Sequence, residues 1–362
     1  MKKFIISSDA LKAATKKLGQ VIVANPTLPV LYNIYCKVTK GEVELIATDL
    51  EITISYKCPA EAVDTFELLL PFDFLNKIVS VIKIQPVTVE HPSVRKARII
   101  TDNDVFEINS LQKFEDFPKL PAAPKKIGLE LDSDFTYLLS KAMLTSSKDE
   151  TRPAMTKACL DIQGDNINLV STDAHCLYRH KINVDSTEKE QLLLSKKMAH
   201  ALDSLDKIEL SWTAKMIIVK SDKIVIWCTR HEEAYPNYNA IIPNHGPNLK
   251  LQKNDMVDAL HKACISSATT KQTNIYARKE KGFINFETDD ADMSRKILVK
   301  IPGDYTGDVE AIAVNAKKLL TILDQVPGQE INLHIGTAYT AILISTEEDA
   351  DYLGLLMPLM IN

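Results

Sequence analysis

The sequence predicts an α+β protein built from three repeats of one domain. Three strand-like runs each end in a Thr-Asp pair, and the aspartates of these pairs lie 124 and then 116 residues apart, at Asp49, Asp173 and Asp289. Two helical patterns recur in each third of the 362-residue chain, in the same order relative to these runs. Several elements that repeat in one order at a long period indicate tandem copies of one fold.

The first helix of each repeat is expected at residues 10–22, 135–148 and 256–268, where apolar residues follow a helical spacing. The second helix is expected at residues 71–82, 195–205 and 315–326. Pro71 and Ser195 suit the start of a helix, and Asn315 suits an N-cap.

The three strand runs cover residues 43–49, 167–173 and 284–289, and second strands are expected at residues 51–56, 177–182 and 296–301. Each domain should therefore contain two helices and about eight strands in antiparallel sheets. Proline-rich stretches near 121–124 and 243–247 mark the expected boundaries. We predict domains at residues 1–122, 123–247 and 248–362.

Composition excludes several classes of protein. With 45% hydrophobic and 25% charged residues, the chain is expected to be a soluble globular protein. No apolar run reaches the roughly 20 residues of a membrane span, and the N-terminus lacks the apolar core of a signal peptide. The six scattered cysteines contain no C-x-x-C pair, which is typical of reduced thiols in a cytoplasm. Glycine-rich phosphate-binding motifs are absent, so we expect no nucleotide cofactor. Without a C-x-x-C pair or H-E-x-x-H spacing, we expect no metal.

The net charge of −5 is unevenly distributed, because positive charge is concentrated in the predicted helices. The six predicted helices contain eleven lysines and four aspartates, a sum of +7, and the rest of the chain sums to −12. Lysines are common on solvated helix surfaces, which is one explanation. The other is a basic surface that faces a polyanion and contacts phosphates without reading bases.

At this point the sequence resembles the family of the bacterial DNA polymerase III β subunit, the replicative sliding clamp, over essentially its whole length. The stretches that carry the resemblance are residues 25–31 (NPTLPVL), 47–52 (ATDLEI), 152–153 (RP), 171–177 (STDAHCL), 235–238 (YPNY) and 356–359 (LMPL). The resemblance implies a DNA clamp fold, with two chains closing head to tail into a six-domain ring whose helices line the hole. It also implies a non-enzymatic processivity factor on double-stranded DNA. Its partners would be the replicative polymerase, the clamp loader and other proteins with a clamp-binding motif.

The resemblance also assigns site residues. The cleft for a partner peptide would be built from Met155, Thr172, Ala174, His175, Leu177, Pro236, Ile241, Leu355, Met357, Pro358 and Leu359. The positions facing DNA would be Lys12, Lys16, Asn25, Lys141, Lys148, Arg152, Lys196, Lys197 and Lys318. Phe106 and Ile265 would lie in the dimer interface.

The chain departs from the family pattern at several of these places. Ala174-His175-Cys176 stands where the family usually has Gly-His-Arg, and arginines often found near Asn239 and Met360 are missing. These losses predict a more apolar cleft. Asn25 stands where many members carry a DNA-contacting arginine, which predicts a weaker contact there.

The sequence lacks residues that a catalytic triad or a metal-dependent hydrolase would need. Asp173 and His175 could form half of a triad, but no nucleophile-elbow sequence accompanies them, and a turn-forming role for the repeated aspartate is favoured. The acidic run at residues 288–292 is expected to be a solvated hairpin loop. The alternative class is a metal-dependent DNA-processing hydrolase on a repeated α+β scaffold, and a third is a scaffold that does not bind DNA.

Overall fold

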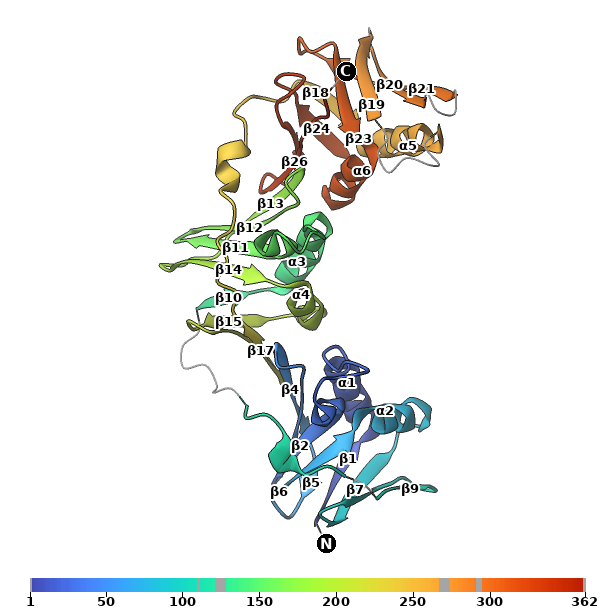
Figure 1. Cartoon of the computed structure of the whole chain (residues 1–362), viewed down its shortest axis with the longest axis vertical. Coiled ribbons are helices and arrows are strands. Elements are labelled where there is room, and N and C mark those ends of the chain that lie inside the picture. Colours follow the sequence, from blue (N-terminus) through green and yellow to red (C-terminus); the bar gives the residue numbers. More distant parts are fainter. Residues whose placement is uncertain are drawn as a thin grey trace. The chain divides into compact units, whose positions relative to one another are not determined.

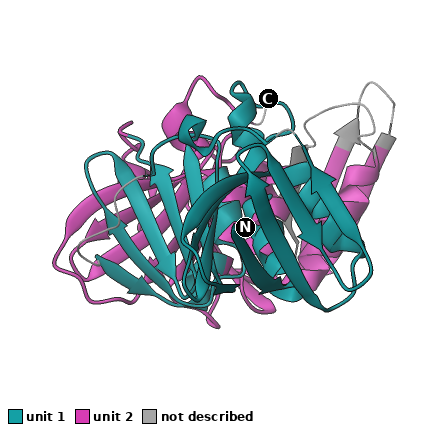
Figure 2. Ribbon diagram, turned by 90° about the horizontal axis from the view of Figure 1, so that it is seen from below, with its two compact units in different colours: residues 1–136, 197–231 teal, residues 137–196, 232–362 magenta. Residues whose placement is uncertain are grey.

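A computed structural model describes residues 2–109, 111–120, 128–266, 274–280, 282–290 and 295–360. The chain forms two compact units (Figure 2): residues 1–136 with 197–231, and residues 137–196 with 232–362. The middle third of the sequence contributes to both units. The division into domains at 1–122, 123–247 and 248–362 remains a prediction.

The six predicted helices form, with bounds shifted by a few residues. They are α1 (Ser8–Leu18), α2 (Phe72–Val81), α3 (Ser133–Thr145), α4 (Lys196–Leu202), α5 (Lys253–Ala263) and α6 (Ala316–Gln325). Asn315 is the expected N-cap of α6, because its side-chain oxygen accepts the backbone N–H of Lys318 at 3.1 Å. Lys148 lies beyond the end of α3, and a 3₁₀ turn, η5 (Cys264–Ser266), continues α5.

Unit 1 holds two antiparallel sheets. The five-stranded sheet has the order β5-β1-β7-β8-β9 and the eight-stranded sheet has the order β10-β15-β16-β17-β4-β3-β2-β6. Their strands are β1 (Lys2–Ser7), β2 (Asn33–Thr39), β3 (Glu42–Thr48), β4 (Ile52–Pro59), β5 (Glu61–Ala62), β6 (Phe66–Pro71), β7 (Pro86–Ser93), β8 (Lys96–Ile100), β9 (Val105–Ile108), β10 (Leu129–Leu131), β15 (Ile208–Trp212), β16 (Met216–Ser221) and β17 (Ile224–Thr229).

Unit 2 also holds two antiparallel sheets. The nine-stranded sheet has the order β14-β11-β12-β13-β26-β25-β24-β18-β22 and the four-stranded sheet has the order β21-β20-β19-β23. Their strands are β11 (Ala158–Gln163), β12 (Asn166–Thr172), β13 (Cys176–Ile182), β14 (Lys189–Leu194), β18 (Leu249–Gln252), β19 (Asn274–Glu280), β20 (Phe283–Asp290), β21 (Arg295–Pro302), β22 (Asp304–Tyr305), β23 (Ala311–Asn315), β24 (Glu330–His334), β25 (Ile342–Ser345) and β26 (Tyr352–Leu356).

One element order recurs three times along the chain (Figure 1). Each copy runs strand, helix, three strands, one or two strands, helix, and three strands. Thus β4, β13 and β21 are equivalent strands, as are β9, β17 and β26. The described residues therefore confirm the α+β repeat that the sequence predicts.

Strands from successive copies pair directly within each unit. In unit 1, β4 of the first copy pairs with β17 of the second, from Ile52–Cys228 to Tyr56–Ile224. In unit 2, β13 of the second copy pairs with β26 of the third, from Cys176–Leu356 to His180–Tyr352. The same two strand positions therefore make both junctions.

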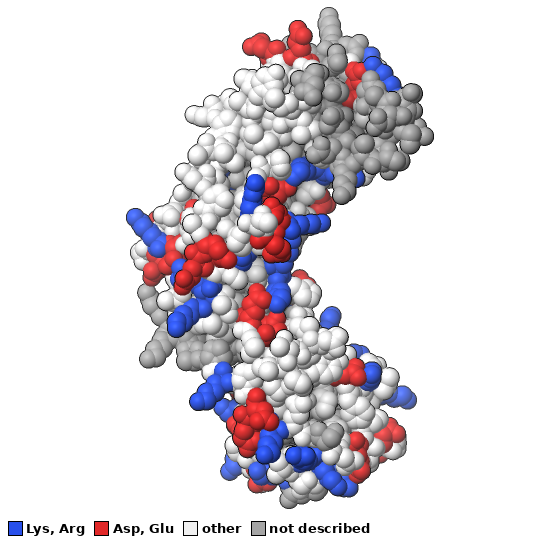
Figure 3. Space-filling model, in the orientation of Figure 1, with Lys and Arg blue, Asp and Glu red and all other residues white. Residues whose placement is uncertain are grey.

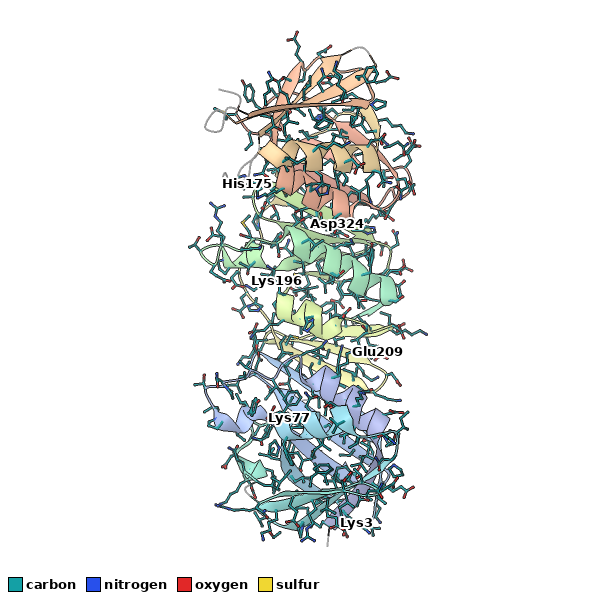
Figure 4. All side chains as sticks on the ribbon, turned by 90° about the vertical axis from the view of Figure 1, so that its right-hand side faces the viewer. Lys3, Lys77, His175, Lys196, Glu209 and Asp324 are labelled. Carbon is teal, nitrogen blue, oxygen red and sulfur yellow. The ribbon has the colours of Figure 1, made fainter. Side chains whose placement is uncertain are left out.

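Matching apolar clusters lie on one face of the sheet in the first two copies. Phe117 packs with Ile46 and Leu69 in unit 1, and Tyr235 packs with Val170 and Leu193 in unit 2. These aromatic residues belong to the Phe-Pro and Tyr-Pro pairs of the two copies. Figure 4 looks onto the helices, which lie on the opposite side of the sheets in each unit.

The prediction that the acidic run at residues 288–292 forms a loop is wrong for part of the run. Thr288, Asp289 and Asp290 belong to β20, and Asp290 pairs with Arg295 of β21. Backbone pairing with β21 extends this strand beyond the point where the equivalent strands of the other copies end. The remaining residues of the run lie outside the described residues.

Asn315→Ala should lower the free energy of unfolding by about 1 kcal/mol, because the N–H of Lys318 loses its capping acceptor. Asn315→Asp keeps an acceptor at this position and should retain most of the stability. Urea unfolding of both variants and of the natural protein measures the difference. Equal losses in the two variants would contradict a capping role.

Candidate partner-binding cleft and DNA-facing helices

The Thr-Asp pairs of the first two copies build the same turn between two strands. Oδ1 of Asp49 accepts the N–H groups of Glu51 and Ile52 at 3.0 and 2.8 Å. Oδ1 of Asp173 accepts those of His175 and Cys176 at 2.9 and 2.7 Å. The turn-forming role predicted for these aspartates is confirmed in both copies.

The threonines complete each turn. The hydroxyl of Thr172 donates to the carbonyl of Cys176 at 2.6 Å and accepts the N–H of Ala174 at 3.1 Å. The residue after each aspartate has left-handed backbone, with φ of 76° at Leu50 and 73° at Ala174. Glycine adopts this conformation without the steric cost that a side chain brings. The family glycine that Ala174 replaces therefore suits the observed backbone.

The second oxygen of each aspartate binds a lysine from the next copy. Asp49 Oδ2 lies 2.9 Å from Lys197 Nζ, which also lies 2.6 Å from Glu51 Oε2. In the same way, Asp173 Oδ2 binds Lys318 Nζ. Both lysines lie in the first turn of the second helix of their copy.

Each of these ion pairs shifts the pKa of one member, Lys197 in unit 1 and Asp173 in unit 2. Hydrogen bonds to Glu51 and Asp49 raise the pKa of Lys197. Burial alone would raise the pKa of Asp173, but the Lys318 ammonium and the turn amides outweigh it and hold that pKa below its ordinary value. Lys197 and Asp173 therefore carry their charges at neutral pH.

A second lysine contact accompanies each junction. Lys17 of α1 donates to the carbonyl of Asp203 at 2.8 Å, just after α4. Lys141 of α3 donates to the carbonyl of Asp324 in α6 at 2.9 Å, and its Nζ lies 3.3 Å from the Asp324 carboxylate. Burial lowers the pKa of Lys17 to about 8. Each unit thus ties a first helix to the second helix of the following copy by the same type of contact.

The predicted DNA-facing set therefore divides into two groups. Lys141, Lys197 and Lys318 form ion pairs within their own units. The exposed members outside the junctions are Lys12, Lys16, Asn25, Lys148, Arg152 and Lys196, and Lys197 is exposed as well. Over their observed bounds the helices contain eleven lysines and six aspartates, an excess of five positive charges rather than the predicted seven. Figure 4 labels Lys77 of unit 1 and Lys196 of unit 2 on the helical side of the chain.

The predicted cleft residues lie around the β13–β26 junction. The exposed members are Ala174, His175, Pro236 and Ile241, and the half-buried members are Met357, Pro358 and Leu359. Met155, Thr172, Leu177 and Leu355 are buried. The buried members can therefore support a binding surface, and the others can contact a partner.

An apolar cluster lies behind this surface. Leu177 and Leu355 are partners in the β13–β26 register, and Met357 packs against the cluster that contains them. The N–H of Met357 donates to the carbonyl of His175 at 2.8 Å, and the N–H of Leu359 donates to that of Ala313 at 2.7 Å. The tail is thus fixed beside the turn that carries His175. Figure 3 shows few charged side chains around β24 and β26 in the upper part of the view.

The two residues assigned to a dimer interface lie at element ends. Phe106 lies on β9, an edge strand, with its ring centroid 6.4 Å from that of Phe74 in α2. Ile265 follows α5 and is 70% exposed. Both positions are therefore accessible in the single chain.

The described residues contain no group of three or more His, Cys, Asp or Glu side chains arranged to hold a metal ion. No described helix is both long and apolar enough to cross a membrane. All six cysteines are free thiols, and five of them are buried. The carboxylate of Asp173 is engaged by turn amides and Lys318.

Known proteins match this arrangement. A family model described as the N-terminal domain of the DNA polymerase III beta subunit matches residues 2–121. The chain is 23% identical to the beta sliding clamp of Streptomyces coelicolor, over 99% of this chain and 100% of the relative. It is 20% identical to that of Bacillus subtilis, over 98% and 99% of the two chains.

Solved structures give the same result. The DNA polymerase sliding clamp from Bacillus subtilis superposes with a TM-score of 0.92 at 19% identity, over 100% of both chains. The DNA polymerase III beta subunit from Thermotoga maritima superposes with a TM-score of 0.88 at 18% identity, again over 100% of both chains.

The fold is that of a DNA sliding clamp. The family model over the first third of the chain and the full-length relatives agree with this fold, so the chain is similar over its whole length to the beta sliding clamps of DNA polymerase III. The resemblance stated from the sequence is confirmed. No comparison supports the alternative of a metal-dependent hydrolase.

Sequence reasoning missed the lysine contacts of the junctions. It placed Lys141, Lys197 and Lys318 with the DNA-facing residues because their charge and helical position gave no sign of an acidic partner. A signal was present, because Lys197 and Lys318 stand at the same point of successive copies and each follows an earlier Thr-Asp pair. Positions that repeat with the fold indicate a structural role.

Lys318→Met should weaken binding of a cleft peptide by about three- to tenfold, since Asp173 would lose a charge-assisted bond while holding the turn of His175. Lys197→Met removes the equivalent contact in unit 1 and should leave peptide affinity unchanged. Fluorescence anisotropy with a labelled peptide measures both. Equal effects of the two substitutions would contradict a local role for Lys318.

Proposed function

We propose that the protein acts as a DNA polymerase processivity factor: two copies close into a ring around double-stranded DNA and tether partner proteins through the cleft. The observation that carries the ring is the repeated junction. Two of three equivalent strand positions are paired within the chain, as β4–β17 and β13–β26. The third pair, β21 and β9, consists of two edge strands. Pairing of β21 with β9 of a second copy repeats the junction and, done twice, closes the assembly.

The side chains at these edges support such a contact. Leu298 on β21 is 53% exposed and Val105 on β9 is 58% exposed. Unprotected edge strands with exposed apolar residues invite pairing with another chain. Phe74 stands where Lys197 and Lys318 stand in the other copies, one residue before the first large buried side chain of each helix. The junction between copies would thus be more apolar than those within a chain.

DNA would contact the helical side of each unit. The exposed lysines Lys12, Lys16, Lys148 and Lys196, together with Arg152 and Asn25, would supply a diffuse phosphate field. With Lys141, Lys197 and Lys318 committed to junctions, we expect this field to be weaker than the sequence predicts. Contacts of this type do not read base edges, so binding would be independent of sequence.

The cleft would take the short linear motif of a polymerase, a clamp loader or another clamp-binding protein. The exposed imidazole of His175 and the half-buried Met357 and Leu359 offer a polar and an apolar side to an extended peptide. Methionine adapts to differently shaped partners. We propose that the protein performs this function in the cytoplasm, where thiols remain reduced.

Ile265→Asp should dissociate the dimer, because association would bury an unpaired carboxylate. Val63→Asp is a matched control, since Val63 is 80% exposed and follows β5 at the other edge of the sheet that ends in β9. Sedimentation velocity should give two copies of the 40.4 kDa chain for the natural protein and the control. A fully dimeric Ile265→Asp protein at sub-micromolar concentration would refute the placement of Ile265.

Deletion of residues 357–362 should abolish binding of a peptide of the pattern Gln-Leu-x-Leu-Phe and leave the dimer intact, because Met357, Pro358 and Leu359 form one wall of the cleft. His175→Ala should weaken the same binding more modestly, by roughly three- to tenfold. Calorimetric titration measures both affinities. Unchanged affinity in a dimeric truncated protein would show that the peptide binds elsewhere.

A further inference from the structure

A second, polar cavity lies on the sheet face that carries the apolar cluster. Its volume is about 240 Å³, and its lining includes Asp161, Asn168, Arg179, Lys181, Tyr238 and Asp351. All of these residues belong to unit 2. None of them was assigned a role from the sequence.

The cavity occurs where three neighbouring strands change from apolar to polar residues on one face. Along β13, Leu177 is followed on the same face by Arg179 and Lys181, because side chains alternate along a strand. Asn168 of β12 and Asp161 of β11 are register partners, and Asn168 is also the partner of Lys181. Both therefore lie on the same face as Lys181, next to the apolar residues of their own strands. Polar groups in place of a continued core indicate a site that binds something polar.

The acidic groups of the cavity already have donors. Asp161 is 4% exposed, and its carboxylate accepts the Tyr238 hydroxyl at 2.7 Å and the amides of Gln163 and Gln191 at 3.1 and 3.2 Å. Asp351 accepts the side-chain amide of Asn183 at 2.8 Å.

Arg179 differs from these groups. Its Nε is buried without a hydrogen-bond partner among the described residues. The Lys181 ammonium has no ion-pair partner within the described part of unit 2. A buried donor without an acceptor destabilises the folded state. A guanidinium also presents two parallel N–H groups that match the two oxygens of a carboxylate.

The geometry points to a binding site for one carboxylate group, held by Arg179 and Lys181. A carboxylate suits the cavity because its two oxygens match a guanidinium, and the nearby carboxylates of Asp161 and Asp351 disfavour a doubly charged phosphate more strongly than a singly charged group. The carboxylate belongs either to an acidic residue of the peptide in the cleft or to a free small acid.

The peptide source rests on the proposed function and on the continuity of the two sites. Leu177 of the cleft and Arg179 of the cavity are two residues apart on β13, a distance of roughly 7 Å. Tyr238 joins the sites, since its ring packs in the apolar cluster while its hydroxyl reaches Asp161. A peptide extended by two to four residues can cover this distance.

Two peptides test the site in the full-length protein. Both carry the pattern Gln-Leu-x-Leu-Phe with four added residues at either end, which contain glutamate in one and glutamine in the other. The natural protein should bind the glutamate peptide about five- to tenfold more tightly, as expected for a charge-assisted pair. Arg179→Gln and the milder Lys181→Gln should remove this advantage and leave the affinity of the glutamine peptide unchanged. Lys189→Gln, an exposed position on β14 outside the cavity, should retain it.

Succinate tests the free-acid source, by thermal unfolding against chloride at equal ionic strength. The site belongs to a free acid if succinate raises the midpoint temperature of unfolding in a saturable way that requires Arg179, while the glutamate peptide binds no more tightly than the glutamine peptide. If neither the glutamate advantage nor the succinate effect depends on Arg179 or Lys181, the carboxylate site is refuted. Failure of the glutamine peptide to bind at all would count against the cleft instead, and the succinate titration would still decide on the cavity.

Discussion

Antiparallel pairing between strands of successive copies is the constraint on which the rest of the structure depends. In unit 1 this pairing makes one eight-stranded sheet out of two copies, and in unit 2 it makes one nine-stranded sheet. Backbone hydrogen bonds fix the register of both junctions, so the loops and helices beside them are held at defined positions. In each case the Thr-Asp turn lies next to the pairing strand, and its aspartate forms an ion pair with a lysine of the following copy.

This arrangement gives charged residues two separate tasks. Lys197 and Lys318 at the junctions bind the carboxylates of the turns, and Lys12, Lys16 and Lys196 elsewhere on the helices are exposed without a junction partner. The carboxylates of these pairs are largely covered, since the side chains of Asp49 and Asp173 are 9% and 24% exposed, and each pair fixes the position of its turn. At the second junction the ordered turn carries His175, and the tail strand follows beside it. The same contact that joins two copies therefore also shapes the surface around His175 and the tail.

Much of the fold could be predicted from the sequence because repetition made weak signals reinforce one another. The helices, the Thr-Asp turns and the Asn315 cap depend on local spacing and side-chain chemistry, which a sequence displays directly. The strand pairs β4–β17 and β13–β26 depend on residues far apart in the chain, and no local pattern reports them. The prediction of a loop was wrong for residues 288–290 of the acidic run, since pairing with β21 extends β20 past the position where the equivalent strands of the other copies end.

The candidate site was predicted in a similar way. The cleft residues were assigned by resemblance, and the structure brings Leu177, Leu355 and Met357 together around one apolar cluster. Burial of Met155 and Thr172 was not evident from residue type. The contacts of Asp161 and Tyr238 could not be foreseen either, because Tyr238 lies 77 residues further along the chain.

Retention on circular and linear DNA tests the central claim, that two copies close around the duplex, most directly. The protein, loaded onto a nicked circular duplex, is separated from free protein by gel filtration in high salt before and after a single restriction cut. A closed ring remains with the circle and is released when the DNA is linearised, because only topology holds it. Loss from the intact circle, or equal retention on linear DNA with free ends, would contradict the account.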